Sequence, residues 1–107
     1  MQISEGLQTA TVGVKHTLTT ISSSNPGIYV ILVDTSSLSS GDSIELTAEI
    51  KVGSSSSLKQ AYYQLYSNVQ TDPAKISVPV AMPFGGTFSL KQTAGTGRIF
   101  VWTLLHM

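Results

Sequence analysis

Polar and apolar residues alternate along much of the chain, and the alternation is clearest in residues 43–52. Every even position in this segment is apolar. The odd positions are polar: three are charged, and the other two are the hydroxyl residues Ser43 and Thr47. The apolar positions are Ile44, Leu46, Ala48, Ile50 and Val52. A period of two is that of a β-strand with one buried face and one face in water. We therefore predict a strand here with its even positions in the core.

The same period recurs less clearly in other segments. Ala10, Val12, Val14 and Leu18 alternate with polar residues, with His16 in register, which predicts one long strand. Ile76, Val78, Val80 and Met82 alternate in the same way. Pro79 interrupts this second segment and lacks an N–H group, which favours an edge strand or a bulge. Residues 58–69 fit a helix or a strand by period, and their three tyrosines favour a strand.

Turn-forming residues divide the chain into segments of similar length. They gather at residues 25–27, 39–42, 53–57, 71–73, 83–86 and 94–97. Regularly spaced turns between short alternating segments are typical of antiparallel β proteins. The sequence therefore predicts a single all-β domain over residues 1–107, either an antiparallel β-sandwich or a jelly-roll-like barrel, with about seven strands.

The glycines at residues 95–97 could cradle a phosphate or form the tip of a β-hairpin. A phosphate loop needs a helix after its glycines, because the free N–H groups at the helix N-terminus hold the anion. Here a β-branched and aromatic segment follows, residues 98–105. The sequence therefore predicts a hairpin.

Residues 28–33 and 99–105 are apolar on both faces of the expected strand. A sandwich strand usually buries one face and exposes the other. Two-faced strands indicate that part of the outer sheet surface is covered by another subunit. We place the bulkier set Phe100, Trp102 and Leu104 in the core. The expected interface residues are then Ile99, Val101 and Leu105, followed by Tyr29, Ile31 and Val33.

The composition narrows the functional classes. Only 11% of the residues are charged and the formal net charge is zero, whereas serine and threonine together supply 28 residues. A neutral, hydroxyl-rich surface does little to prevent self-association. The few basic residues are scattered, which argues against nucleic-acid binding. The sequence lacks a signal-peptide pattern, and its longest apolar run is too short for a bilayer, so we expect a soluble chain without a membrane partner.

Candidate catalytic and metal-binding residues are few. His16 and His106 lack a nucleophile motif, and Asp34 and Asp42 flank a serine-rich loop without matching a calcium motif. We expect turn-closing roles for the two aspartates, and no enzyme activity, metal, cofactor or small-molecule substrate. Tyr62, Tyr63, Tyr66 and Trp102 leave one alternative open, since aromatic faces can stack on sugar rings.

Three segments resemble small virion structural proteins of tailed bacteriophages. They read GIYVILVDTSSLSSGDSIELTAEIKV, AYYQLYSNVQTDPAKISVPVAM and FSLKQTAGTGRIFVWTLL. The resemblance lies in the general character of these segments and in their order along the chain, and it covers roughly three quarters of the chain. It implies a β-rich, non-enzymatic protein on the virion capsid surface, made in the host cytoplasm. It also implies a decoration or cement subunit, often trimeric, that binds the major capsid protein.

The expected function is therefore to clip neighbouring major capsid subunits together. Residues 1–8 lack turn-forming chemistry and could be an extended arm that adds a strand to a neighbour. The alternative function is a carbohydrate-binding module of a tail fibre or adhesin. Its stacking residues would be Tyr62, Tyr66 and Trp102.

Overall fold

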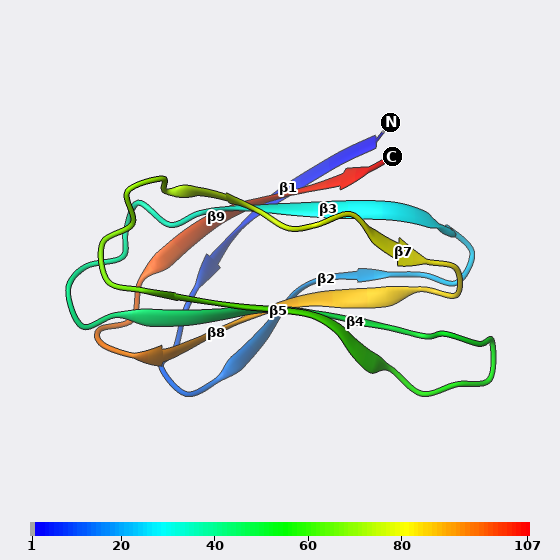
Figure 1. Ribbon diagram of the computed structural model, residues 1–107, viewed down its shortest axis with the longest axis horizontal. Coiled ribbons are helices and arrows are strands. Elements are labelled where there is room, and N and C mark those ends of the chain that lie inside the picture. Colours follow the sequence, from blue (N-terminus) through cyan, green and yellow to red (C-terminus); the bar gives the residue numbers. More distant parts are fainter. Residues whose placement is uncertain (1) are drawn as a thin grey trace.

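Two antiparallel sheets pack face to face in the computed structural model, which describes residues 2–107 (Figure 1). The strands are β1 (Gln2–Thr9), β2 (Lys15–Ile21), β3 (Gly27–Asp34), β4 (Ser43–Ile50), β5 (Lys59–Ser67), β6 (Ala74–Ile76), β7 (Val80–Met82), β8 (Gly86–Ala94) and β9 (Ile99–His106). The predicted all-β sandwich is confirmed. The strands that the structure describes number nine rather than about seven.

The strand order is that of a jelly roll. The first sheet runs β1-β9-β3-β6, with β7 also pairing with β3, and the second runs β2-β8-β4-β5. The pairs β1–β9, β2–β8, β3 with β6 and β7, and β4–β5 are nested, so the chain resembles one long hairpin rolled into two layers. An eight-stranded jelly roll has this pairing. Its sixth strand is divided here into β6 and β7.

The division between β6 and β7 occurs around Pro79, as an edge strand or bulge at this proline predicts. Ser77 occupies the gap and pairs with β3: its N–H donates to Ile31 O (2.9 Å), and its Oγ accepts from Ile31 N–H (3.0 Å). Val80 and Met82 then point into the core, whereas Ile76 faces outward. The expected alternation of residues 76–82 is therefore correct for Val80 and Met82, which are buried, and wrong for Ile76, which is exposed.

Two expected strand extents are wrong. The single long strand expected from residue 10 is broken by a turn in which Val14 N–H donates to Thr11 O (3.0 Å) and Gly13 has a φ of 86°. This turn carries the chain from the first sheet to the second and leaves Val12 and Val14 exposed. Val52 lies beyond the end of β4 and is exposed as well.

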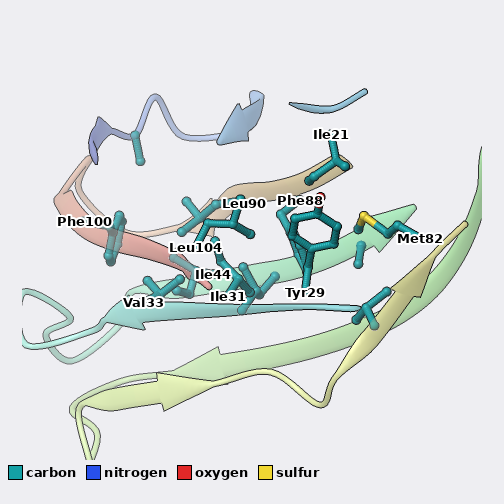
Figure 2. Close-up of a cluster of buried hydrophobic side chains, with 14 of the residues drawn as sticks. Ile21, Tyr29, Ile31, Val33, Ile44, Met82, Phe88, Leu90, Phe100 and Leu104 are labelled. Atoms are coloured by element: carbon teal, nitrogen blue, oxygen red, sulfur yellow. The ribbon is translucent and has the colours of Figure 1, made fainter. Parts of the chain in front are cut away.

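The core fills the space between the sheets, as Figure 2 shows. Leu90 from β8, Leu104 from β9 and Ile44 from β4 gather at the centre of one cluster, with Phe100 toward one end and Phe88 beside Tyr29 toward the other. Phe88, Phe100 and Ile44 have no exposed surface. Large apolar side chains from both inner faces thus account for the cohesion of the two layers.

The hairpin expected at residues 94–97 is wrong. β8 pairs with β2 and β4 in the second sheet, and β9 pairs with β1 and β3 in the first, so this loop crosses between the layers. Buried polar side chains hold it. Gln92 donates to Ala94 O (3.0 Å) and Thr96 O (2.6 Å) and accepts from Arg98 N–H (3.0 Å).

Asp42 supports the same crossing loop from the other side. Its carboxylate accepts from Ser39 N–H (2.8 Å), Thr96 N–H (3.1 Å) and Arg98 Nε (2.8 Å). The bond from Ser39, with those from Thr96 and Arg98, lowers the pKa of Asp42, although burial opposes this. The loop is therefore defined by polar contacts that local turn chemistry does not reveal.

Candidate interaction surface

Strand β9 presents different side chains to its two faces. Phe100 and Leu104 are buried and Trp102 packs against the core, whereas Ile99 and Val101 are 54% and 47% exposed. Leu105 lies on the same outer face and is partly exposed. The expected orientation of this strand is thus confirmed. That its outer residues bind another subunit stays a prediction.

The expected orientation of β3 is wrong. Tyr29, Ile31 and Val33 are buried in the core, so they cannot contact another subunit. The outer positions are Ile28, Val30 and Leu32. Both faces of this strand are apolar, so its sequence gives no sign of which face turns inward.

Strand register places outer residues from four strands side by side. Ile3 lies opposite Leu105, which lies opposite Val30; Leu7 lies opposite Val101, and Leu32 opposite Ile76. We call this set the apolar face. It comprises Ile3, Leu7, Ile28, Val30, Leu32, Ile76, Ile99, Val101 and Leu105, of which Val30 is only 8% exposed. Sequence reasoning missed the first five and Ile76, although Ile3 and Leu7 share the odd register of residues 2–9.

Charged side chains are sparse on the apolar face. At its strand positions within residues 2–107, the charged residues are Glu5 and Asp34. Asp34 Oδ1 accepts from Ser36 N–H (2.9 Å) and from Ser36 Oγ (2.5 Å). The hydroxyl bond and then the backbone bond from Ser36 lower the pKa of Asp34. Asp34 therefore closes a turn at the rim of this surface.

The outer face of the second sheet has the opposite character. It carries Lys15, Lys91, Glu45 and Glu49, and Lys15 Nζ lies 2.6 Å from Glu49 Oε1. Tyr63 Oη donates to Glu45 Oε2 (2.7 Å), and this bond raises the pKa of Tyr63. A face of hydroxyl groups and charged side chains is stable in water, so the two sides of the sandwich differ chemically.

Two shallow grooves indent the apolar face beside Val101. One, of about 330 Å³, lies between Val101 and the Pro73–Ala74 segment and includes Leu32. The other, of about 320 Å³, is lined by Glu5, Gly6, Leu7 and Val101. Val101 borders both grooves, so it lies at the centre of the grooved surface that a partner would contact.

The three sugar-stacking candidates do not come together. Tyr62 and Tyr66 lie on β5 in the second sheet, and Trp102 lies on β9 in the first. Trp102 covers Gly6 so closely that a Cβ there would lie 2.5 Å from its ring. Lys75 Nζ lies 5.1 Å from the centroid of the Tyr66 ring. Burial, then a hydrogen bond with Tyr62, raises the pKa of Tyr66 to about 12.

The histidines take part in local contacts. His16 Nε2 accepts from Thr11 N–H (3.0 Å) in the turn between β1 and β2. The His106 ring stacks on Tyr29 with centroids 4.3 Å apart, at the side of a polar cleft of about 210 Å³ that Asn25 and Ser22 also line. Within residues 2–107, no three histidine, aspartate or glutamate side chains are close enough to share a metal ion.

Comparison of the chain with protein families, curated proteins and solved structures finds no match. No helix in the described part, residues 2–107, is long and apolar enough to cross a membrane. The apolar face is therefore the feature from which a function can be argued.

Proposed function

We propose that this chain is a non-enzymatic structural protein that binds another protein surface through its apolar face. The observation that carries the proposal is the contrast between the two outer sheet faces. One holds nine apolar side chains with Glu5 and Asp34 as its charged residues, and the other holds hydroxyl groups, charged side chains and the Lys15–Glu49 ion pair. Water solvates the second face well, whereas covering the first removes apolar surface from water.

The dimensions of the apolar face suit a specific interface. Three strands of eight residues, with β6 and β7 of three residues each along the fourth row, lie about 4.8 Å apart and cover roughly 500 Å². A partner of matching shape would bury a similar area, so the total is about 1,000 Å². This is the lower limit for a specific protein–protein contact, and multiple copies on one large partner would strengthen it.

The more specific proposal is a decoration or cement role on a bacteriophage capsid, with the major capsid protein as partner. The resemblance of three chain segments to small virion proteins supports it, as does the low charge of the chain. The jelly roll adds support, because viral capsid domains use this architecture, although lectin domains use it as well. In this role the polar second face would remain in solvent.

Val101→Lys tests the proposal at the centre of the apolar face. Covering the exposed half of this valine contributes roughly 1 kcal/mol. Removing an ammonium group from water against an apolar partner costs more than this, although Glu5 and Asp34 line the neighbouring grooves. We expect an unchanged circular dichroism spectrum and roughly 100-fold weaker co-sedimentation with shells of the major capsid protein from the same genome.

Thr47→Lys is the matched control, because Thr47 occupies a central position on the outer face of the second sheet. It should bind the shells as the wild type does. Equal binding by all three proteins would show that the apolar face is not the contact. Loss of binding in the Thr47→Lys variant alone would place the contact on the opposite side of the sandwich.

A further inference from the structure

The two sheets have four edges, formed by β1, by β6 with β7, by β2 and by β5. An edge strand presents unpaired N–H and C=O groups that can pair with another chain. Proteins usually protect such edges with prolines, bulges or lysines. The four edges of this sandwich differ in this respect.

Three edges carry protective features. The β6–β7 edge is broken at Pro79 and preceded by Pro73. β2 has a register shift between Thr17 and Thr19 against β8. β5 begins with Lys59 and carries an extra residue, Ala61, at a register shift against β4. Each of these irregularities bends or blocks the edge against an added strand.

Strand β1 lacks these features. Gln2–Thr9 pairs with β9 over eight consecutive positions without a register shift and contains neither proline nor a basic residue. Among the edges described over residues 2–107, β1 is thus the regular one. Figure 1 shows β1 at the margin of the upper sheet, beside β9.

The free backbone groups of β1 can be assigned. Ala10 N–H donates to Arg98 O (2.8 Å), and these two residues continue the β1–β9 register. Antiparallel strands alternate between hydrogen-bonded and non-bonded pairs, so the even residues of β1 bond to β9. The odd residues direct their N–H and C=O groups away from the sheet. They are Ile3, Glu5, Leu7 and Thr9.

This edge is complementary to a second copy of itself. Residues opposite one another share a face, so odd residues must pair with odd residues. A register with Gly6 on the two-fold axis pairs Ile3 with Thr9 and Glu5 with Leu7. It uses the outward N–H and C=O groups in about eight hydrogen bonds, two of which replace the exposed bond from Gln8 Nε2 to Thr9 O (2.9 Å) in each copy. Centring the axis on Glu5 uses fewer groups and sets two carboxylates opposite each other, which is unfavourable.

We propose that β1 pairs antiparallel with β1 of a second copy of this chain, in the register centred on Gly6. The first sheets of the two copies then form one continuous sheet, and their apolar faces join across Ile3 and Leu7. The trimer implied by the sequence resemblance is replaced in this arrangement by a two-fold dimer. The inference does not depend on what the apolar face binds.

Glu5→Pro tests the edge, because this N–H points away from β9 and the substitution leaves the β1–β9 ladder intact. Light scattering should give twice the 11.4 kDa chain mass for the wild type and the single chain mass for Glu5→Pro. Glu5→Ala is the matched control, because it removes the same carboxylate but keeps the N–H group. It should remain a dimer. A monomeric wild type, a trimer, or an unchanged Glu5→Pro dimer would overturn the proposal.

Cysteine pairs test the register independently of any effect of proline on folding. The chain has no cysteine, so introduced thiols report only on the interface. Hydrogen-bonded pairs have Cα atoms about 5.5 Å apart, within disulfide range. A mixture of Ile3→Cys and Thr9→Cys chains should form a mixed disulfide. Ile3→Cys mixed with Leu7→Cys should not.

A cross-link between Ile3→Cys and Leu7→Cys in place of the expected pair would overturn the Gly6 register, and no cross-link in either mixture would overturn the dimer. Adding Val101→Lys to the Ile3→Cys and Thr9→Cys chains separates this inference from the proposed function. The disulfide should still form, because Val101 lies on the sheet face and not at the β1 edge. Failure of shell binding with retained cross-linking would thus leave the dimer intact.

Discussion

Gln92→Leu removes the side chain that holds the crossing loop between β8 and β9 while keeping a similar volume. Gln92 has no exposed surface, and its amide makes three hydrogen bonds to the backbone of this loop. Leucine fills the space but leaves Arg98 N–H, Thr96 O and Ala94 O without these partners. The substitution therefore removes hydrogen bonds from buried polar groups and leaves the packing largely unchanged.

The size of the effect is worked from Arg98 N–H and Thr96 O, which lie beyond the end of β8. A buried donor or acceptor left without a partner costs about 1–3 kcal/mol. Two such groups give roughly 2–6 kcal/mol, and the exposure of the loop tip to water favours the lower half of this range. A loss of about 2–4 kcal/mol should lower the midpoint of thermal unfolding by more than 8 °C, at about 4 °C or more per kcal/mol.

Urea denaturation followed by circular dichroism measures this loss directly. Gln60→Leu is the control, because Gln60 is exposed on β5. It should change the free energy of unfolding by no more than about 0.5 kcal/mol. If Gln92→Leu also stays within that margin, the hydrogen bonds of Gln92 do not define the crossing loop, and the account given above is refuted.

Three further predictions concern individual side chains. Phe88→Ala should lower the free energy of unfolding by about 3–5 kcal/mol, because this ring is fully buried between the sheets; a loss below about 1 kcal/mol would contradict that packing. The pKa of Asp42 lies below its ordinary 3.8 in the folded chain, so its stabilisation is fully present above pH 3.8 and disappears as the pH falls through the folded value. The stability difference between wild type and Asp42→Asn should therefore be larger at pH 7 than at pH 2, and a constant difference would argue against this role. Ultraviolet titration should show one tyrosine with a pKa of about 12 that is missing in Tyr66→Phe; an unchanged titration curve would contradict the burial of that phenol.

The jelly-roll pairing depends on contacts between residues far apart in the chain. β1 pairs with β9 and β2 with β8, so the two ends of the sequence meet in neighbouring strands. No local pattern encodes such partners, because a period of two describes one strand and not its neighbours. The predicted hairpin failed for this reason. Turn chemistry at residues 94–97 fits a hairpin and a crossing loop equally well.

The candidate surface was predictable only in part. The sequence indicated that an outer sheet face would be apolar and identified Ile99 and Val101 on it. It could not place Ile3 and Leu7 beside them, because that neighbourhood arises from the pairing of β1 with β9. The expectation of a separate arm at residues 1–8 is wrong for residues 2–8. They form an edge strand of the chain's own sheet, and Met1 lies outside the described residues.

Alternation by itself determined that β4 is a strand and that Ile44, Leu46 and Ala48 face the core, because one face of that strand is polar. Only the tertiary structure decided that Tyr29, Ile31 and Val33 turn inward on β3. Both faces of this strand are apolar, so turning the other face inward would bury a different set of apolar residues. The sequence pattern is compatible with either orientation. Its orientation is fixed by its neighbours, since β9 and β6 pair with it in a register that points the odd positions between the two sheets.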